Sequence, residues 1–178
     1  MAETRLKMAL VGCGGIAQVH WQGIKEIATR VDVTAVVDTN TDSATAMAQL
    51  TDAEAFFDLE EALKNGDFEA VDIMLPHNLH ESAALACFSA GKHVLLEKPM
   101  AHSLESAERI LQASQKVATT FMIAEQAQYW TDVIKARELM DAGAIGEVIS
   151  ASGNFYDRVV IDPDAPPPWR SSLAISGG

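Results

Sequence analysis

The chain has few cysteines and few basic side chains. Its two cysteines, Cys13 and Cys87, each lie in a segment predicted to be regular structure and lack the paired spacing of a zinc site. We therefore expect two reduced thiols and no disulfide scaffold. Lysine and arginine together number 13 against 25 acidic residues, which gives a formal net charge of −12. Such a surface repels phosphate backbones and anionic lipids, which argues against nucleic-acid and membrane partners.

Long hydrophobic runs are also missing. No apolar stretch approaches the roughly 20 residues that a transmembrane helix needs, and residues 1–7 contain no apolar signal core. We therefore predict a soluble, cytoplasmic protein. Apolar residues nevertheless make up 48% of the chain, which is enough for a folded core and excludes a disordered chain.

Short apolar runs alternate with stretches of helical periodicity. Strands are predicted at 7–11, 31–37, 55–57, 71–75, 93–96 and 117–124, and helices at about 16–27, 43–50, 59–65, 80–90, 104–111 and 131–140. Because the strands are continuously apolar, both faces of their sheet must be covered by helices. The predicted fold class is therefore α/β, with a doubly wound parallel sheet. The proline-rich stretch 162–168 predicts an extended loop.

A glycine-rich turn joins the first predicted strand to the first predicted helix. Residues 12–17 read Gly-Cys-Gly-Gly-Ile-Ala, which fits the dinucleotide pattern G-x-G-x-x-A in its strand–turn–helix context. Gly12 permits the tight turn, Gly14 lets a pyrophosphate approach the backbone, and Ala17 lets the helix pack closely. The predicted cofactor-binding residues of this turn are Gly12, Cys13, Gly14, Gly15, Ile16 and Ala17. The alternative is a tight turn that binds nothing.

An acidic residue, Asp38, follows the second predicted strand, 21 residues after Ala17. A carboxylate at this place can accept hydrogen bonds from the ribose hydroxyls of NAD and repels the additional phosphate of NADP. We therefore predict NAD as the cofactor in preference to NADP. The alternative is that Asp38 only caps the following turn, which Thr39 and Asn40 also fit.

Charged residues end a strongly apolar strand at residues 94–100, Val-Leu-Leu-Glu-Lys-Pro-Met. In a parallel sheet, the carboxyl ends of the strands form the edge where ligands bind. Lys98 is therefore the best candidate for acid–base chemistry, with partial burial and a positive nicotinamide as means of lowering its pKa. Neighbouring side chains of a strand point in opposite directions, so Glu97 is expected to anchor the structure. The alternative is a solvated lysine at a strand end.

Three further motifs occur in order after the glycine turn. They are Leu-Pro-His-Asn-Leu-His at 75–80, Gly-Lys-His-Val-Leu-Leu-Glu-Lys-Pro at 91–99, and Leu-Met-Asp-Ala-Gly-Ala-Ile-Gly-Glu-Val at 139–148. Together they resemble the Gfo/Idh/MocA family, the glucose-fructose oxidoreductase and inositol dehydrogenase group, over roughly residues 7–178. The segment at 91–99 is the most specific part of this resemblance.

The resemblance implies a Rossmann domain followed by a mixed-sheet α/β domain. It also implies hydride transfer between a nicotinamide and a hydroxyl or carbonyl carbon of a small molecule such as a sugar or cyclitol. Lys98 would act at the reacting oxygen, and the Trp-Arg pair at 169–170 resembles one that reaches the cofactor in some members. The further predicted cofactor-binding residues are Leu75, Pro76, Asn78, His80, Glu97, Lys98, Gln126, Trp169 and Arg170.

The chain departs from the family pattern in two places. After the sixth predicted strand it has Gln126 where members often carry an Asn-x-Arg stretch, and it stops at Gly178, before the Asp-x-Gly-x-His motif that supplies a catalytic histidine. We therefore expect a Rossmann domain at 1–122 and an incomplete second domain at 123–178, with a strand at 147–156. The chain would be a fragment of an oxidoreductase or, alternatively, a non-catalytic dinucleotide-binding module. Family members oligomerise through the second sheet, so a homo-oligomer is expected only of the longer form.

The five histidines invite a metal hypothesis. His77 and His80 share one side of a predicted helix start, but no third ligand is evident, so no metal site is predicted. His20, His93 and His102 are interpreted as structural residues.

Overall fold

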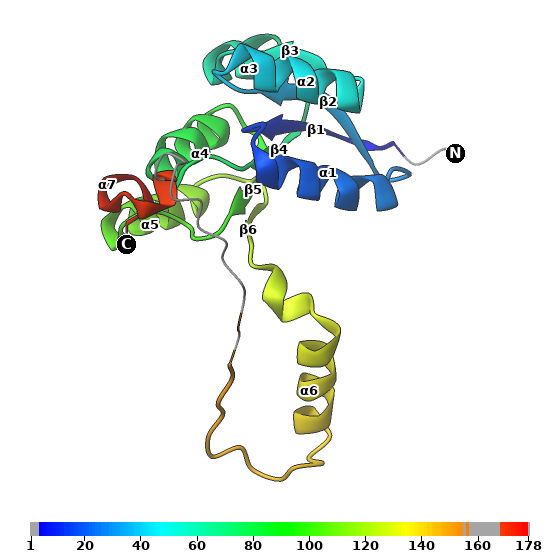
Figure 1. Cartoon of the computed structure of the whole chain (residues 1–178), viewed down its shortest axis with the longest axis vertical. Helices are drawn as coiled ribbons and strands as arrows, with labels where there is room; N and C mark the ends of the chain where they lie inside the picture. Colours follow the sequence, from blue (N-terminus) through cyan, green and yellow to red (C-terminus); the bar gives the residue numbers. More distant parts are fainter. Residues whose placement is uncertain (1–3, 155, 157–167, 178) are drawn as a thin grey trace. The chain divides into compact units, whose positions relative to one another are not determined.

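The computed structural model describes residues 4–154, 156 and 168–177. The chain divides into two compact units, one formed by residues 1–124 with 168–178 and the other by residues 125–167. The first unit contains the sheet and its helices (Figure 1). The domain boundary expected after residue 122 remains a prediction, as does the expected content of a second domain.

The first unit is built on a six-stranded sheet in which all neighbouring strands are parallel. The strands are β1 (Leu6–Val11), β2 (Val31–Val37), β3 (Glu54–Phe56), β4 (Ala70–Ile73), β5 (His93–Glu97) and β6 (Phe121–Ala124), in the spatial order β3-β2-β1-β4-β5-β6. This order confirms the predicted doubly wound α/β sheet. The direction of strand addition reverses between β1 and β4, and ligands bind at such a reversal in this class of sheet.

Helices connect the strands on both faces of the sheet (Figure 1). They are α1 (Gly15–Glu26), α2 (Thr41–Thr51), α3 (Leu59–Asn65), α4 (His80–Ser89) and α5 (Leu104–Ser114), with a short helix η1 (His77–Leu79) before α4. The side chains of Asn40, Asp58 and Ser103 cap α2, α3 and α5 by accepting a backbone N–H of the first turn.

Two apolar layers cover the faces of the sheet. Residues of α1 and α2, among them Ala17 and Met47, pack on one face against Leu10 and Val36. On the other face, residues of α3, α4 and α5 pack against strand residues such as Ile73. The layers hold α1 against the carboxyl ends of β1 and β4, where the site residues gather.

One predicted strand begins later than expected. Residues 117–119 form bends, residue 120 has no regular structure, and β6 starts at Phe121. Val117 instead packs on the core beside the helices, and the Thr120 N–H donates to the His93 ring, so these residues serve as a connection.

The second unit contains a short helix η2 (Gln126–Tyr129) and α6 (Thr131–Asp141). The predicted helix at 131–140 is confirmed, and Gly143 follows it with a φ of 70°, a left-handed conformation common after helices. The strand expected at 147–156 is wrong for its described residues, which form no regular structure. A strand needs a neighbour for its backbone hydrogen bonds, and the described residues offer none to this segment.

The described C-terminal residues belong to the first unit. They form η3 (Trp169–Ser171) and α7 (Leu173–Ser176), and α7 packs on η1. The His77 Nδ1 atom lies 2.9 Å from the carbonyl oxygen of Ser176 and links the two segments. The loop expected at 162–168 lies outside the described residues except for its last proline.

Candidate functional site

The glycine turn after β1 has the geometry that its motif predicts. Gly12 has a φ of 95°, and a Cβ atom there would lie 2.5 Å from the Met74 carbonyl oxygen. Only glycine fits this turn. A Cβ atom on Gly14, in contrast, would meet no atom within 4 Å. The space above Gly14 is therefore open to a ligand that approaches the backbone.

The start of α1 completes this open turn. Gly14 is the N-cap residue, it makes no side-chain capping bond, and the first turn of α1 contains no acidic residue. The first amides of a helix carry partial positive charge and favour anions. Ala17 is fully buried and packs the helix against the sheet, as predicted. We call Gly12–Ile16 the glycine cradle; its residues fit a pyrophosphate group.

Asp38 lies beside the glycine cradle at the end of β2. Its Oδ2 atom accepts a hydrogen bond from the Cys13 N–H at 2.8 Å, and its Oδ1 atom accepts one from the Asn40 N–H at 2.8 Å. The carboxylate thus braces the glycine turn and caps the next turn, as the alternative interpretation expected, while ribose binding by Asp38 remains a prediction. Each oxygen retains a lone pair that can accept a hydrogen bond from a ribose hydroxyl group.

Cys13 itself faces inward. Its side chain is buried, and its Sγ atom lies 3.7 Å from the Val37 carbonyl oxygen. Burial, assisted by the charge of Asp38, raises the pKa of the Cys13 thiol to about 12, and burial also raises the pKa of Cys87 to about 12. Both thiols therefore stay protonated and unreactive at neutral pH. Cys13 can offer a cofactor only its backbone.

The segment after β4 carries the second group of predicted residues. Leu75 and Pro76 are half-buried and Asn78 is exposed. His80 is fully buried, with Nε2 2.8 Å from the Leu75 carbonyl oxygen and Nδ1 3.0 Å from the Pro99 carbonyl oxygen. In this conformation His80 joins the ends of β4 and β5, and neither ring nitrogen is free for a cofactor. Burial lowers the pKa of His80, while the two carbonyl oxygens oppose that shift.

The end of β5 holds the residues of the Glu-Lys-Pro motif. Lys98 is exposed just beyond the strand, and its peptide bond to Pro99 is cis. Glu97 is buried, and its Oε2 atom accepts a hydrogen bond from the Lys98 N–H at 2.8 Å. The structure thus gives Glu97 the anchoring role expected from strand geometry and leaves the Lys98 ammonium at the sheet edge.

A polar cluster below Lys98 escaped the sequence interpretation. His20 of α1 contacts both Asp72 of β4 and Glu97 of β5. The sequence suggested a structural role for His20, and Asp72 was not among the predicted site residues. The overlooked signal is an acidic residue within the apolar strand Ala70-Val71-Asp72-Ile73, because a buried acid needs a partner.

The Trp-Arg pair belongs to the first unit, whereas Gln126 belongs to the second unit. The Trp169 ring meets the His77 ring edge-on with centroids 4.7 Å apart, and the Arg170 guanidinium stacks on Trp169 at 4.4 Å. This pair therefore lies against η1, next to predicted cofactor residues. Gln126 belongs to the second unit, so its proposed contact with a nicotinamide remains a prediction.

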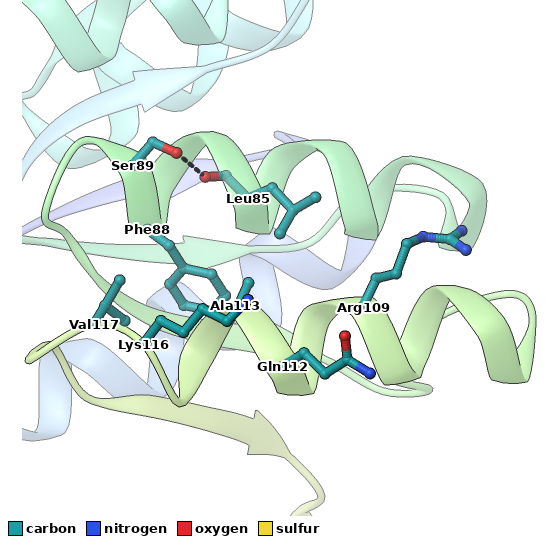
Figure 2. A pocket seen from close by; sticks show the side chains of 8 residues that line it. All are labelled: Leu85, Phe88, Ser89, Arg109, Gln112, Ala113, Lys116 and Val117. Carbon is teal, nitrogen blue, oxygen red and sulfur yellow. Dashed lines mark hydrogen bonds between the residues drawn. The ribbon is translucent and has the colours of Figure 1, made fainter.

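A surface hollow lies away from these residues, between α4 and α5 (Figure 2). It measures about 410 Å³, and its lining includes Phe88, Arg109 and Lys116 but none of the predicted site residues. The Arg109 guanidinium is already paired with the Glu81 carboxylate, whose pKa this contact lowers to about 2. We therefore place the candidate site at the sheet edge.

The part of the chain that the structure describes contains neither a membrane-spanning helix nor a metal-binding cluster. No helix there combines the length and apolar character of a membrane span. No three His, Cys, Asp or Glu side chains there gather in the manner of a metal site.

The chain matches a family model described as "Oxidoreductase family, NAD-binding Rossmann fold" over residues 6–125. Among curated proteins, it is 35% identical over 184 residues to an inositol 2-dehydrogenase of Arthrobacter, covering 99% of this chain and 51% of the relative. It is 31% identical over 120 residues to the levoglucosan dehydrogenase of Pseudarthrobacter phenanthrenivorans, covering 67% of this chain and 31% of the relative. The chain thus spans about half or less of the length of these relatives.

Solved structures share the same fold. An NAD binding oxidoreductase from Klebsiella pneumoniae superimposes with a TM-score of 0.82 at 28% identity, covering 98% of this chain and 48% of that one. The WlbA dehydrogenase from Bordetella pertussis, in complex with NADH and UDP-GlcNAcA, gives a TM-score of 0.78 at 27% identity, covering 82% of this chain and 42% of that one. The match of two thirds of the chain to the family model confirms the resemblance seen in the motifs, and the chain belongs to the Gfo/Idh/MocA oxidoreductase family with its NAD-binding Rossmann fold.

Proposed function

We propose that the chain binds NAD along the carboxyl edge of its sheet and that Lys98 handles the proton in hydride transfer to or from a sugar or polyol. The supporting observation is that the open glycine cradle, Asp38 and Lys98 all follow the carboxyl ends of parallel strands in one unit. The family description and the relatives named as inositol and levoglucosan dehydrogenases point to the same chemistry.

The strand order suggests how a dinucleotide would lie. The glycine cradle at β1 would hold the central pyrophosphate, with β2 on one side and β4 and β5 on the other. Asp38 at the end of β2 suits the ribose of the adenosine half, and its charge disfavours the 2′-phosphate of NADP. The nicotinamide half is then directed toward β4 and β5, where Lys98 lies roughly 10 Å from β1, two strand spacings away.

The proposed chemistry divides between the cofactor and the chain. When bound, the nicotinamide accepts or supplies the hydride. Oxidation of an alcohol also releases the hydroxyl proton, and the neutral amine of Lys98 would accept this proton; in the reverse direction the ammonium would return it. An exposed lysine at the sheet edge can reach a substrate hydroxyl, whereas the buried groups around it cannot.

The cofactor proposal is tested by calorimetric titration of the purified chain with NADH. The Gly14→Val variant places a side chain in the open cradle, where a Cβ atom meets no protein atom within 4 Å, so we expect its affinity for NADH to fall roughly tenfold or more. Gly23, an exposed glycine of α1 that also has no neighbour within 4 Å, provides the matched control, Gly23→Val. Equal affinities for the two variants would refute the cradle as the binding site.

The catalytic part is tested separately, with NAD⁺ and a panel of polyols and sugars that includes inositol. Turnover that is lost in Lys98→Ala while NADH affinity is retained supports the role of Lys98. Binding of NADH with no turnover of any substrate supports the alternative of a non-catalytic dinucleotide-binding module.

A cytoplasmic location belongs to the same proposal and rests on the two free, buried cysteines.

A further inference from the structure

His20 connects the helix of the glycine cradle to the strand that carries the Glu-Lys-Pro motif. It is the sixth residue of α1. Its Nδ1 atom lies 2.7 Å from Asp72 Oδ2, and its Nε2 atom lies 3.1 Å from Glu97 Oε1. The side chains of the three residues are 16%, 2% and 12% exposed, respectively, so the cluster is largely shielded from water.

The geometry favours the doubly protonated form of this histidine. A neutral imidazole has one N–H donor and one bare nitrogen, and a bare nitrogen facing a carboxylate oxygen would be repelled. Both nitrogens of His20 face carboxyl oxygens, so an imidazolium with two N–H donors satisfies both contacts. Burial raises the pKa of Asp72, and the hydrogen bond and charge of His20 oppose that shift. Hydrogen bonding to Asp72 is the largest cause that raises the pKa of His20; burial opposes this shift, and the charges of Asp72 and Glu97 add to it.

Asp72 is an unusual residue for its position in the sheet. Its register partners on β1 and β5 are the apolar residues Leu10 and Leu95. Its Oδ1 atom is buried without a hydrogen-bond partner among the described residues. A buried carboxylate costs stability that an apolar side chain at the same place would not. The fold alone therefore does not explain Asp72, whereas an orienting role toward His20 does.

Glu97 passes this arrangement on to Lys98. One of its carboxylate oxygens is held by His20, and the other accepts the backbone N–H of Lys98 at 2.8 Å. A carboxylate held at one oxygen can fix the donor at the other. We propose that His20, as an imidazolium clamped between Asp72 and Glu97, is a positioning residue that fixes the backbone of Lys98 at the sheet edge. This inference rests on the acid–base role proposed above for Lys98.

Two further features connect Lys98 to its surroundings. The same helix that carries His20 begins at the glycine cradle, so His20 ties the place of the cofactor phosphates to the place of Lys98. On the other side, His80 contacts the carbonyl oxygen of Pro99. Lys98 thus lies between Glu97 and Pro99, each of which contacts a histidine. Of these two histidines, His20 belongs to α1, the helix that begins at the glycine cradle.

The first test uses the unmodified chain without a ligand. Nuclear magnetic resonance follows the His20 ring signals and the Lys98 backbone amide as the pH rises. We expect both to change on one curve with a midpoint above the ordinary histidine value of 6.5. A His20 midpoint at or below that value, or a Lys98 amide that does not follow His20, would overturn the proposal. Because no cofactor is present, this result is independent of the proposed function.

The second test compares two substitutions by amide hydrogen exchange. His20→Gln offers a single donor nitrogen in place of two and carries no charge, so we expect exchange of the Lys98 amide to become roughly tenfold faster and its pH response to disappear. His93→Gln is the control: His93 is also on β5, but its Nδ1 atom accepts the Thr120 N–H, outside the cluster. Equal exchange of the Lys98 amide in His20→Gln and the unmodified chain would contradict the proposal.

The variants also separate this inference from the proposed function. Because the glycine cradle is unchanged in His20→Gln, its NADH affinity should stay within about twofold, while any turnover falls. Loss of NADH binding by the unmodified chain would refute the proposed function and leave the amide result standing. If His20→Gln does not fold, Asp72→Asn gives the same comparison, with a lowered His20 midpoint as the expected result and an unchanged midpoint as the opposing one.

Discussion

The two halves of the sheet edge are built in different ways. On the β1–β2 side, the glycine cradle is a local motif of consecutive residues, braced by Asp38. On the β4–β5 side, His20 of α1 contacts partners that are 52 and 77 residues away in the sequence. A local motif depends on backbone conformation, which the residue types reveal, whereas the polar cluster depends on packing. The glycine cradle, which is the proposed cofactor half of the site, can therefore be recognised in the sequence, whereas the polar cluster proposed to position Lys98 cannot.

The largest effect is expected at the turn that defines the first half. Gly12→Ala forces a side chain into a left-handed conformation and against the Met74 carbonyl oxygen, so the free energy of unfolding should fall by about 3 kcal/mol. Chemical denaturation measures this loss. Gly14→Ala, with no neighbour near its Cβ atom, is the control and should change stability by less than about 1 kcal/mol. A similar loss in both variants would contradict the division of roles between the two glycines.

The next effect concerns the polar cluster of the second half. The pKa of His20 is raised in the folded state, chiefly by Asp72. Its contribution to stability is therefore complete below the unfolded histidine value of about 6.5 and is lost as the pH rises through the higher folded value. Denaturation of the unmodified chain across this range should show the decline, and His20→Gln should lack it. The same slope in both proteins would show that titration of His20 does not cause the decline in stability.

A smaller effect is expected for the acid that braces the cradle. Asp38→Asn removes the charge that repels a 2′-phosphate, so the preference for NADH over NADPH should fall roughly tenfold. The amide retains one acceptor oxygen for the two backbone N–H groups, so stability should fall by about 1 kcal/mol. Calorimetric titration with both cofactors measures the preference, and an unchanged preference would show that Asp38 only caps its turn.

The smallest effect is expected outside both halves. Arg109→Gln removes the partner of Glu81 beside the hollow between α4 and α5, and NADH affinity should remain within about twofold. Arg109 lowers the pKa of Glu81 to about 2. The stabilisation is therefore present above the ordinary glutamate value and is lost as the pH falls toward 2, so acid denaturation of the variant should begin at higher pH. A strong loss of NADH binding would place the cofactor at the hollow.

The sequence predicted the six parallel strands and the glycine cradle, because apolar runs and glycine positions report local backbone states. It was wrong about a strand at 147–156 as far as the described residues of that segment are concerned, since strand propensity cannot supply a neighbouring strand. It did not identify Asp72 and Glu97 as the partners of His20, because they lie 52 and 77 residues away in the sequence. The contacts of Gln126 and the domain boundary after residue 122 remain predictions.

The central claim is that the two halves of the edge form one NAD site. Titration of the isotope-labelled chain with NADH, followed by backbone amide signals, tests it most directly. We predict that the amides of Gly14, Gly15 and Ile16 shift together with the amide of Lys98, at one saturation midpoint. Shifts confined to residues of α4 and α5 around the hollow, or no shifts at all, would contradict the claim.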